Sequence, residues 1–104
     1  MARMAAVLRR YPRRMNHVVW KVIDGKGILL NLETGAYFEV GPVGLEMWQR
    51  CDGRTLAEHI TPQVARQFRA EPERVARDLQ QFLGELRRRK LIELCATPAR
   101  AARN

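Results

Sequence analysis

The amino-acid sequence predicts an α+β domain in which a three-stranded antiparallel sheet is followed by three helices. Three observations carry this prediction. Apolar residues first recur at every second position, which is the period of a strand, and glycine-containing turns separate these runs. From Pro42 onward the apolar spacing is helical. With 104 residues, the chain is long enough for one domain and too short for two.

The three strands are predicted on either side of two glycine turns. His17–Ile23 is rich in β-branched and aromatic residues, which favour strands. Asp24–Gly27 is a strong turn signal, and apolar residues then alternate along Ile28–Leu32. A second hairpin follows, because the connection Glu33–Gly35 ends in the residue that takes a positive φ without steric cost. The return strand is Ala36–Val40.

The first two helices have recognisable start signals. Gly41 is the expected N-cap of the first helix, with Pro42 as its first residue. The apolar face of this helix consists of Val43, Met47, Trp48 and Cys51. The second helix is predicted to begin at a capping box formed by Thr55 and Glu58. Its apolar residues are Leu56, Ile60, Val64 and Phe68.

Pro62 leaves two geometries open for the second helix. A proline inside a helix removes one backbone hydrogen bond, so the helix either kinks at this point or ends before it. In the second case Thr61 caps a new segment whose first residue is Pro62.

The third helix is predicted to begin at Glu71–Glu73, because acidic residues are favourable at the positive end of the helix dipole. Arg87–Lys90 lies at the negative end. The apolar stripe consists of Val75, Leu79, Phe82, Leu83 and Leu86. Another face consists of Arg74, Asp78, Gln81, Glu85 and Arg88. Leu91–Leu94 is compatible with a short terminal strand.

The net charge of +8 resides almost entirely in the two ends of the chain. Met1–Asn16 has five arginines and no acid, Ala96–Asn104 has two more arginines, and residues 17–95 carry 12 basic and 11 acidic residues. A basic chain suggests nucleic acid or a membrane surface as partner, but a nearly neutral folded part argues against both. We expect a disordered basic arm over residues 1–16, a domain over 17–95 and a flexible basic tail over 96–104.

Few residues are suited to catalysis or metal binding. The chain has no serine and two histidines, and Cys51 and Cys95 are far apart without the spacing of a zinc site. We expect no enzyme activity, no metal and no cofactor. Apolar runs are far too short to span a membrane, and nothing resembles a signal peptide, so we expect a cytoplasmic protein with no membrane partner.

The segment ILLNLETGAYFEVGPVGLEMW, Ile28–Trp48, followed by DGRTLAEHI, Asp52–Ile60, resembles the PqqD-like family. The resemblance runs from about His17 to Glu93 and is closer to the broader group that includes lasso-peptide leader binders. It implies a small winged helix-turn-helix domain, a RiPP recognition element, which binds the leader segment of a ribosomally made precursor peptide. The implied partners are that precursor and a maturation enzyme, such as a radical SAM protein, a protease or a cyclase.

The resemblance also implies where the peptide binds. An edge strand presents free N–H and C=O groups on which an extended peptide can add. In the family, the leader lies on the third strand and packs against the third helix. The implied groove residues here are Ala36, Tyr37, Phe38, Glu39, Val40, Arg74, Val75, Asp78, Leu79 and Phe82.

These ten residues are not equally suited to contact a peptide. Tyr37 and Arg74 are the stronger candidates for direct contact, whereas Phe38, Leu79 and Phe82 are equally compatible with plain core. Along the strand, Tyr37 and Glu39 should share one face, and the two residues that alternate with them should share the other.

The rival interpretation is a winged-helix DNA-binding protein, since three helices, a small sheet and arginine-rich ends fit it loosely. The predicted third helix, however, carries Glu71, Glu73, Asp78 and Glu85 among its arginines. Such a helix makes a weak match to phosphates, so nucleic acid is not the expected partner.

Overall fold

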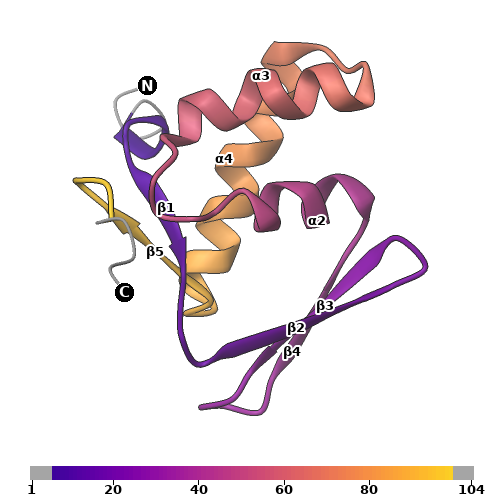
Figure 1. Ribbon diagram of the computed structural model, residues 1–104, viewed down its shortest axis with the longest axis vertical. Coiled ribbons are helices and arrows are strands. Elements are labelled where there is room, and N and C mark those ends of the chain that lie inside the picture. Colours follow the sequence, from indigo (N-terminus) through magenta and orange to yellow (C-terminus); the bar gives the residue numbers. More distant parts are fainter. Residues whose placement is uncertain (1–5, 100–104) are drawn as a thin grey trace, which may run out of the picture.

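The structure, a computed structural model, describes residues 6–99 and is an α+β fold (Figure 1). The elements in chain order are β1 Tyr11–Arg14, β2 Val18–Ile23, β3 Lys26–Asn31, β4 Tyr37–Val40, α2 Pro42–Gln49, α3 Ala57–Phe68, α4 Pro72–Arg88 and β5 Ile92–Cys95. The strands form a three-stranded sheet in the order β2-β3-β4 and a two-stranded sheet of β1 and β5, both antiparallel. The predicted α+β class and three-stranded sheet are confirmed.

The N-terminal segment differs from the prediction, because β1 lies within the segment expected to be disordered. Its strand pairs with β5, Pro12 is fully buried, and the Pro12 carbonyl accepts a hydrogen bond of 2.8 Å from Gly53 N–H. The Met15 N–H donates to the Leu91 carbonyl at 3.0 Å. These contacts are with residues distant in sequence, so the composition of the segment gave no sign of them. The rest of the predicted arm that precedes Ala6, and residues 100–104 of the predicted tail, lie outside the described residues.

Both hairpins of the three-stranded sheet are shaped by local turn chemistry. Asp24 and Gly25 form a two-residue turn with φ values of 53° and 77°, the geometry that matches the twist of a hairpin. In the second hairpin, the Asn31 side-chain oxygen accepts hydrogen bonds from the N–H groups of Glu33 and Thr34 at 2.9 and 3.2 Å. Gly35 has a φ of 78° there, as its position in the predicted turn requires.

The predicted starts of the first and third helices, at Pro42 and at Glu71–Glu73, are confirmed. α2 has Gly41 as N-cap and Pro42 as first residue, and α4 begins at Pro72. The core beneath the three-stranded sheet contains residues from α2, α3 and α4 and from both sheets, namely Leu29, Val40, Leu45, Met47, Trp48, Cys51, Ala57, Ile60, Val64, Ala65, Val75, Leu79, Leu83, Leu86, Leu91 and Ile92. Val43, placed on the apolar face of the first helix, is instead 38% exposed.

The predicted capping box is wrong. α3 begins at Ala57, one residue later than a Thr55 cap implies, and its N-cap Leu56 makes no side-chain capping hydrogen bond. Asp52 explains the difference, because its Oδ1 accepts from the N–H groups of Arg54 and Thr55 at 2.8 and 3.0 Å. Thr55 Oγ1 also donates to Asp52 Oδ2 at 3.3 Å. Its hydroxyl therefore stabilises the preceding turn instead of the helix.

α3 runs through Pro62 to Phe68 without a second start at Thr61. The missing proline N–H lies on the exposed side of the helix, where both Pro62 and Glu58 are exposed. A carbonyl left without its donor can bind water there, so the helix tolerates the proline. No helix among residues 6–99 is long and apolar enough to cross a membrane.

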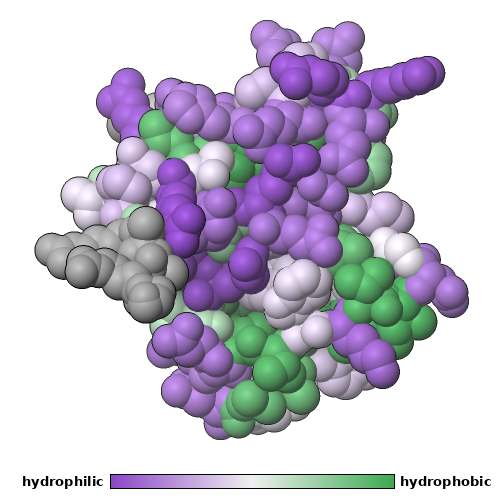
Figure 2. Space-filling view, in the orientation of Figure 1, coloured by the Kyte–Doolittle hydropathy of each residue, from purple (hydrophilic) through white to green (hydrophobic). Residues whose placement is uncertain are grey.

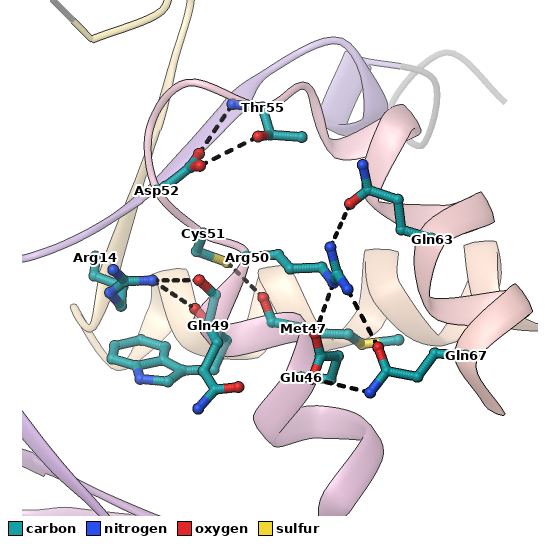
Figure 3. A network of polar contacts seen from close by, with 11 residues as sticks. Arg14, Glu46, Met47, Gln49, Arg50, Cys51, Asp52, Thr55, Gln63 and Gln67 are labelled. Atoms are coloured by element: carbon teal, nitrogen blue, oxygen red, sulfur yellow. Dashed lines mark hydrogen bonds and ion pairs between the residues drawn. The ribbon is translucent and has the colours of Figure 1, made fainter. Parts of the chain in front are cut away.

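Two arginines join the helices and β1 through polar contacts (Figure 3). Arg50 extends from the end of α2 to Gln63 and Gln67 of α3, at 2.7 and 3.2 Å. Arg14 of β1 donates through one Nη to the carbonyls of Trp48 and Gln49, at 3.1 and 2.7 Å. Arg14 thereby satisfies carbonyls at the C-terminal end of α2, where helical carbonyls lack partners, whereas Arg50 joins α2 to α3 through side chains.

Candidate functional site

β4 is an edge strand, because it pairs with β3 on one side and with no strand of the described residues on the other. The Asn31 N–H donates to the Ala36 carbonyl at 2.9 Å, which identifies this as a hydrogen-bonded pair. Backbone direction alternates along an antiparallel ladder. The backbone groups of Phe38 therefore point toward β3, and those of Tyr37 and Glu39 point toward the open edge.

Side-chain burial along β4 follows the same alternation. Tyr37 is 70% exposed and Glu39 is exposed, whereas Phe38 is half-buried and Val40 is 5% exposed. Tyr37 and Glu39 thus share the outer face of the sheet, and the other two face the helices, as the alternation predicts.

Three depressions of ≈ 290, ≈ 460 and ≈ 560 Å³, together called the groove, are each lined by residues of α4. The first borders β4 beside the second hairpin, the second lies between α2 and α4, and the third lies near the start of α4. The second and third share Val43 and Asp78 as lining residues, so they adjoin one another. The floor between α2 and α4 is close-packed: a Cβ placed on Gly44 would lie 3.3 Å from Val40 Cβ and 3.5 Å from Phe82 Cζ.

The hairpin end of the groove is basic. Arg88, Arg89 and Lys90 line it together with Phe38, and the Arg89 guanidinium lies 4.3 Å from the centroid of the Phe38 ring. Arg88 and Arg89 both contact the Glu85 carboxylate, Arg89 through a 2.7 Å hydrogen bond. The hydrogen bond from Arg89, with the charges of both arginines, lowers the pKa of Glu85 below its usual value.

The ten sequence-predicted residues fall into three groups in the structure. Those at the open edge are Ala36, Tyr37, Phe38 and Glu39. Those that line the groove from the α4 side are Arg74, Asp78 and Phe82. Those that are buried in the core are Val40, Val75 and Leu79, at 5%, 4% and 0% exposure. Val75 also borders the third depression, but Leu79 is plain core.

Sequence reasoning missed the basic end of the groove. The sequence pattern places Arg87–Lys90 at the negative end of the helix dipole and assigns no binding role to these residues or to Asn31. In the structure, the Asn31 side-chain amide donates to the Arg89 carbonyl at 3.2 Å and thereby joins the hairpin to the end of α4. No local pattern could reveal this contact, because the two segments are far apart in sequence.

The reactive side chains of the described residues do not form a catalytic group. Burial raises the pKa of the Cys51 thiol to about 12, so it remains protonated and unreactive at neutral pH. Within residues 6–99, no three His, Cys, Asp or Glu side chains gather in a way that could hold a metal ion. What the site presents is backbone pairing along one edge, an apolar floor and charged walls.

Comparisons with known proteins agree with this geometry. The family described as coenzyme PQQ synthesis protein D (PqqD) matches residues 26–92. A solved structure described as TbiB1 in complex with the TbiA(beta) leader peptide is 31% identical, with a TM-score of 0.71, and the match covers 78% of this chain and 94% of that one.

A second structure, described as lasso peptide synthetase B1 complexed with the leader peptide, shares the fold at a TM-score of 0.70. It is 14% identical, and the match covers 80% of this chain and 98% of that one. A search of curated proteins found no match. The family match covers more than half of the sequence, and the chain therefore belongs to the PqqD family.

Proposed function

We propose that this chain is a non-catalytic peptide-binding module that captures the leader segment of a ribosomally synthesised precursor by strand addition and presents it to a maturation enzyme. One observation carries the proposal: the open edge of β4 lies beside a depression to which Ala36, Phe38 and Leu91 contribute apolar lining. The 31%-identical TbiB1 supports it, since that protein is described in complex with a leader peptide.

In this function, the peptide would add to β4 as a fourth strand. Its backbone would pair with the outward N–H and C=O groups of Tyr37 and Glu39, which supply affinity independent of sequence. Alternate peptide side chains would enter the groove toward Phe38 and Phe82, and these would supply specificity. The other side chains would lie beside the exposed Tyr37 ring on the outer face.

Presentation requires a second protein, because the described part of the chain has no group suited to chemistry on the peptide. The outer face of the sheet offers a surface for that protein. Exposed apolar side chains gather on it, and the lower part of Figure 2 shows apolar atoms in green over this sheet. Those that share this face by register include Val19, Ile23, Leu32 and Tyr37. A cytoplasmic location follows from this function, since ribosomal precursors are made there.

Titration of the TbiA(beta) leader peptide and of an unrelated DNA duplex into the protein, each at low and physiological salt, tests this function. We expect saturable peptide binding that survives physiological salt, because backbone pairing and apolar contacts are not screened. DNA association, if present at low salt, should be lost at the higher salt. Salt-resistant DNA binding without peptide binding would overturn the proposal. A peptide scrambled in sequence serves as the control.

A further inference from the structure

The basic depression at the hairpin end of the groove has a composition suited to one kind of ligand. Its three charged lining residues, Arg88, Arg89 and Lys90, are all cationic. Phe38, Ala36 and Leu91 supply apolar surface, and the volume is ≈ 290 Å³. A side chain that is accommodated there must carry negative charge at its end and apolar atoms along its length.

The cations are held in place by contacts on both sides of the chain turn that follows α4. The Asn31 amide donates to the Arg89 carbonyl at 3.2 Å, and the His17 ring lies within hydrogen-bond distance, 2.9 Å, of the Lys90 carbonyl. Lys90 itself takes a left-handed backbone conformation with a φ of 59°. The backbone of the turn is thus attached to the sheet, and the Arg89 side chain is held further by Glu85 and the Phe38 ring, so a ligand has less of Arg89 to order.

Glu85 shows that this cluster can bind a carboxylate. Its two oxygens are divided between Arg88 and Arg89, and Arg89 uses Nε for the contact. Among the described residues, the Nη atoms of Arg89 and the ammonium group of Lys90 make no hydrogen bond or ion pair. A guanidinium has five N–H donors in a planar fork, so Arg89 can hold a second carboxylate without releasing Glu85.

We propose that this depression is a carboxylate subsite, which takes an acidic side chain of the bound peptide. The inference rests on the proposed function and specifies its ligand. The bound peptide pairs its backbone with the outward N–H and C=O of Tyr37. A peptide residue opposite Tyr37 therefore has its side chain on the outer face of the sheet. The acidic residue therefore stands opposite Phe38 or Ala36, where a side chain is directed toward α4.

A carboxylate can also come from the C-terminus of a peptide. The depression lies beside the exposed turn Glu33–Gly35, and the other two depressions lie further along α4, so a bound chain can extend past it in both directions. The subsite is therefore assigned to a side chain within the peptide, and the experiment below separates the two sources.

Selection from a displayed library of random 15-residue peptides on the full-length protein tests the subsite. The same library is selected on the double variant R88Q/R89Q and on the control R87Q, which changes the neighbouring arginine on another side of the helix. We expect the protein and R87Q to select peptides with Asp or Glu at one fixed position, and R88Q/R89Q to lose that preference. Because both arginines are partly exposed, changing the acid to its amide in a selected peptide should weaken binding about fivefold at physiological salt.

The outcomes separate this inference from the function on which it rests. Selected peptides that bind all three proteins equally and show no acidic position would overturn the subsite but keep peptide binding. Failure to select any peptide would overturn the function as well. Selected peptides that lose binding on C-terminal amidation, and keep it when the internal acid is changed, would overturn the side-chain assignment. Circular dichroism of each variant shows that loss of binding is not loss of fold.

Discussion

Within residues 6–99, the three-stranded sheet has two open edges, β2 and β4, with different surroundings. Their backbones present the same alternating groups. The β2 edge is attached to the core by Trp20, whose ring packs edge-on against Trp48 at 6.2 Å, and the Arg14 guanidinium lies 5.9 Å from both rings. The β4 edge borders the basic depression, which the C-terminal end of α4 and the turn after it also line. The comparison shows that an open edge alone does not make a peptide site, because sequence-specific recognition also needs side-chain pockets beside it.

The largest expected effect comes from removing residues 1–16. A chain that begins at His17 would lose β1, and with it the pairing with β5, the buried Pro12 and the Arg14 contacts that support the β2 edge. Since each lost backbone hydrogen bond and buried side chain costs about 1 kcal/mol or more, the free energy of unfolding should fall by at least about 3 kcal/mol.

Urea denaturation of the full chain and of the chain that begins at His17 measures this difference in the free energy of unfolding. A chain from Ala6, which keeps β1, serves as the control and should remain close to full stability. If the chain that begins at His17 is as stable as the full protein, the N-terminal segment is the dispensable arm that its composition suggests.

The second effect contrasts the two edges directly. Glu39→Pro removes an outward N–H from β4, so peptide affinity should fall at least tenfold, about 1.4 kcal/mol, with little loss of stability. Val22→Pro makes the equivalent change on β2, where the register places its backbone groups outward, and should leave affinity within about twofold.

Fluorescence anisotropy with a labelled TbiA(beta) leader peptide measures both variants, and Glu39→Ala separates loss of the N–H from loss of the carboxylate. Equal losses at positions 22 and 39 would mean that the peptide does not distinguish the edges.

The third effect concerns what holds the β2 edge. Arg14→Ala removes the donor to two carbonyls at the end of α2 and should lower the free energy of unfolding by about 1–2 kcal/mol. Arg13→Ala removes an exposed ion pair with Glu93 and should cost less than about 1 kcal/mol. Denaturation midpoints measure both, and peptide affinity should be unchanged in both. A weakened affinity in Arg14→Ala would show that the two edges are coupled.

The smallest effect tests the turn before α3, which is remote from both edges. Asp52→Ala leaves two N–H groups without their acceptor and should lower stability by about 1 kcal/mol. Thr55→Ala removes one exposed hydroxyl contact and should cost about 0.5 kcal/mol or less. A larger loss of stability in Thr55→Ala than in Asp52→Ala would indicate that Thr55 caps the helix after all. Neither change should alter peptide affinity, which makes the pair a baseline for the edge variants.

The sequence by itself determined the features that depend on neighbouring residues. Strand period, the Asp24–Gly25 and Gly35 turns, and the proline starts of α2 and α4 are local preferences, and the structure has each of them. The edge position of β4 was also predictable, since consecutive hairpins place the last strand outermost. The open edge, which is the centre of the candidate site, was thus inferred before its surroundings were known.

Only the tertiary structure decided the features that depend on distant residues. β1 forms because its backbone pairs with β5 and the Pro12 carbonyl accepts a hydrogen bond from the Gly53 N–H. The basic end of the groove likewise forms only where Asn31 binds the turn after α4 and brings Arg89 over Phe38. Such contacts join segments tens of residues apart, and no local pattern records them, because their energy is gained only after the chain has closed the intervening loops.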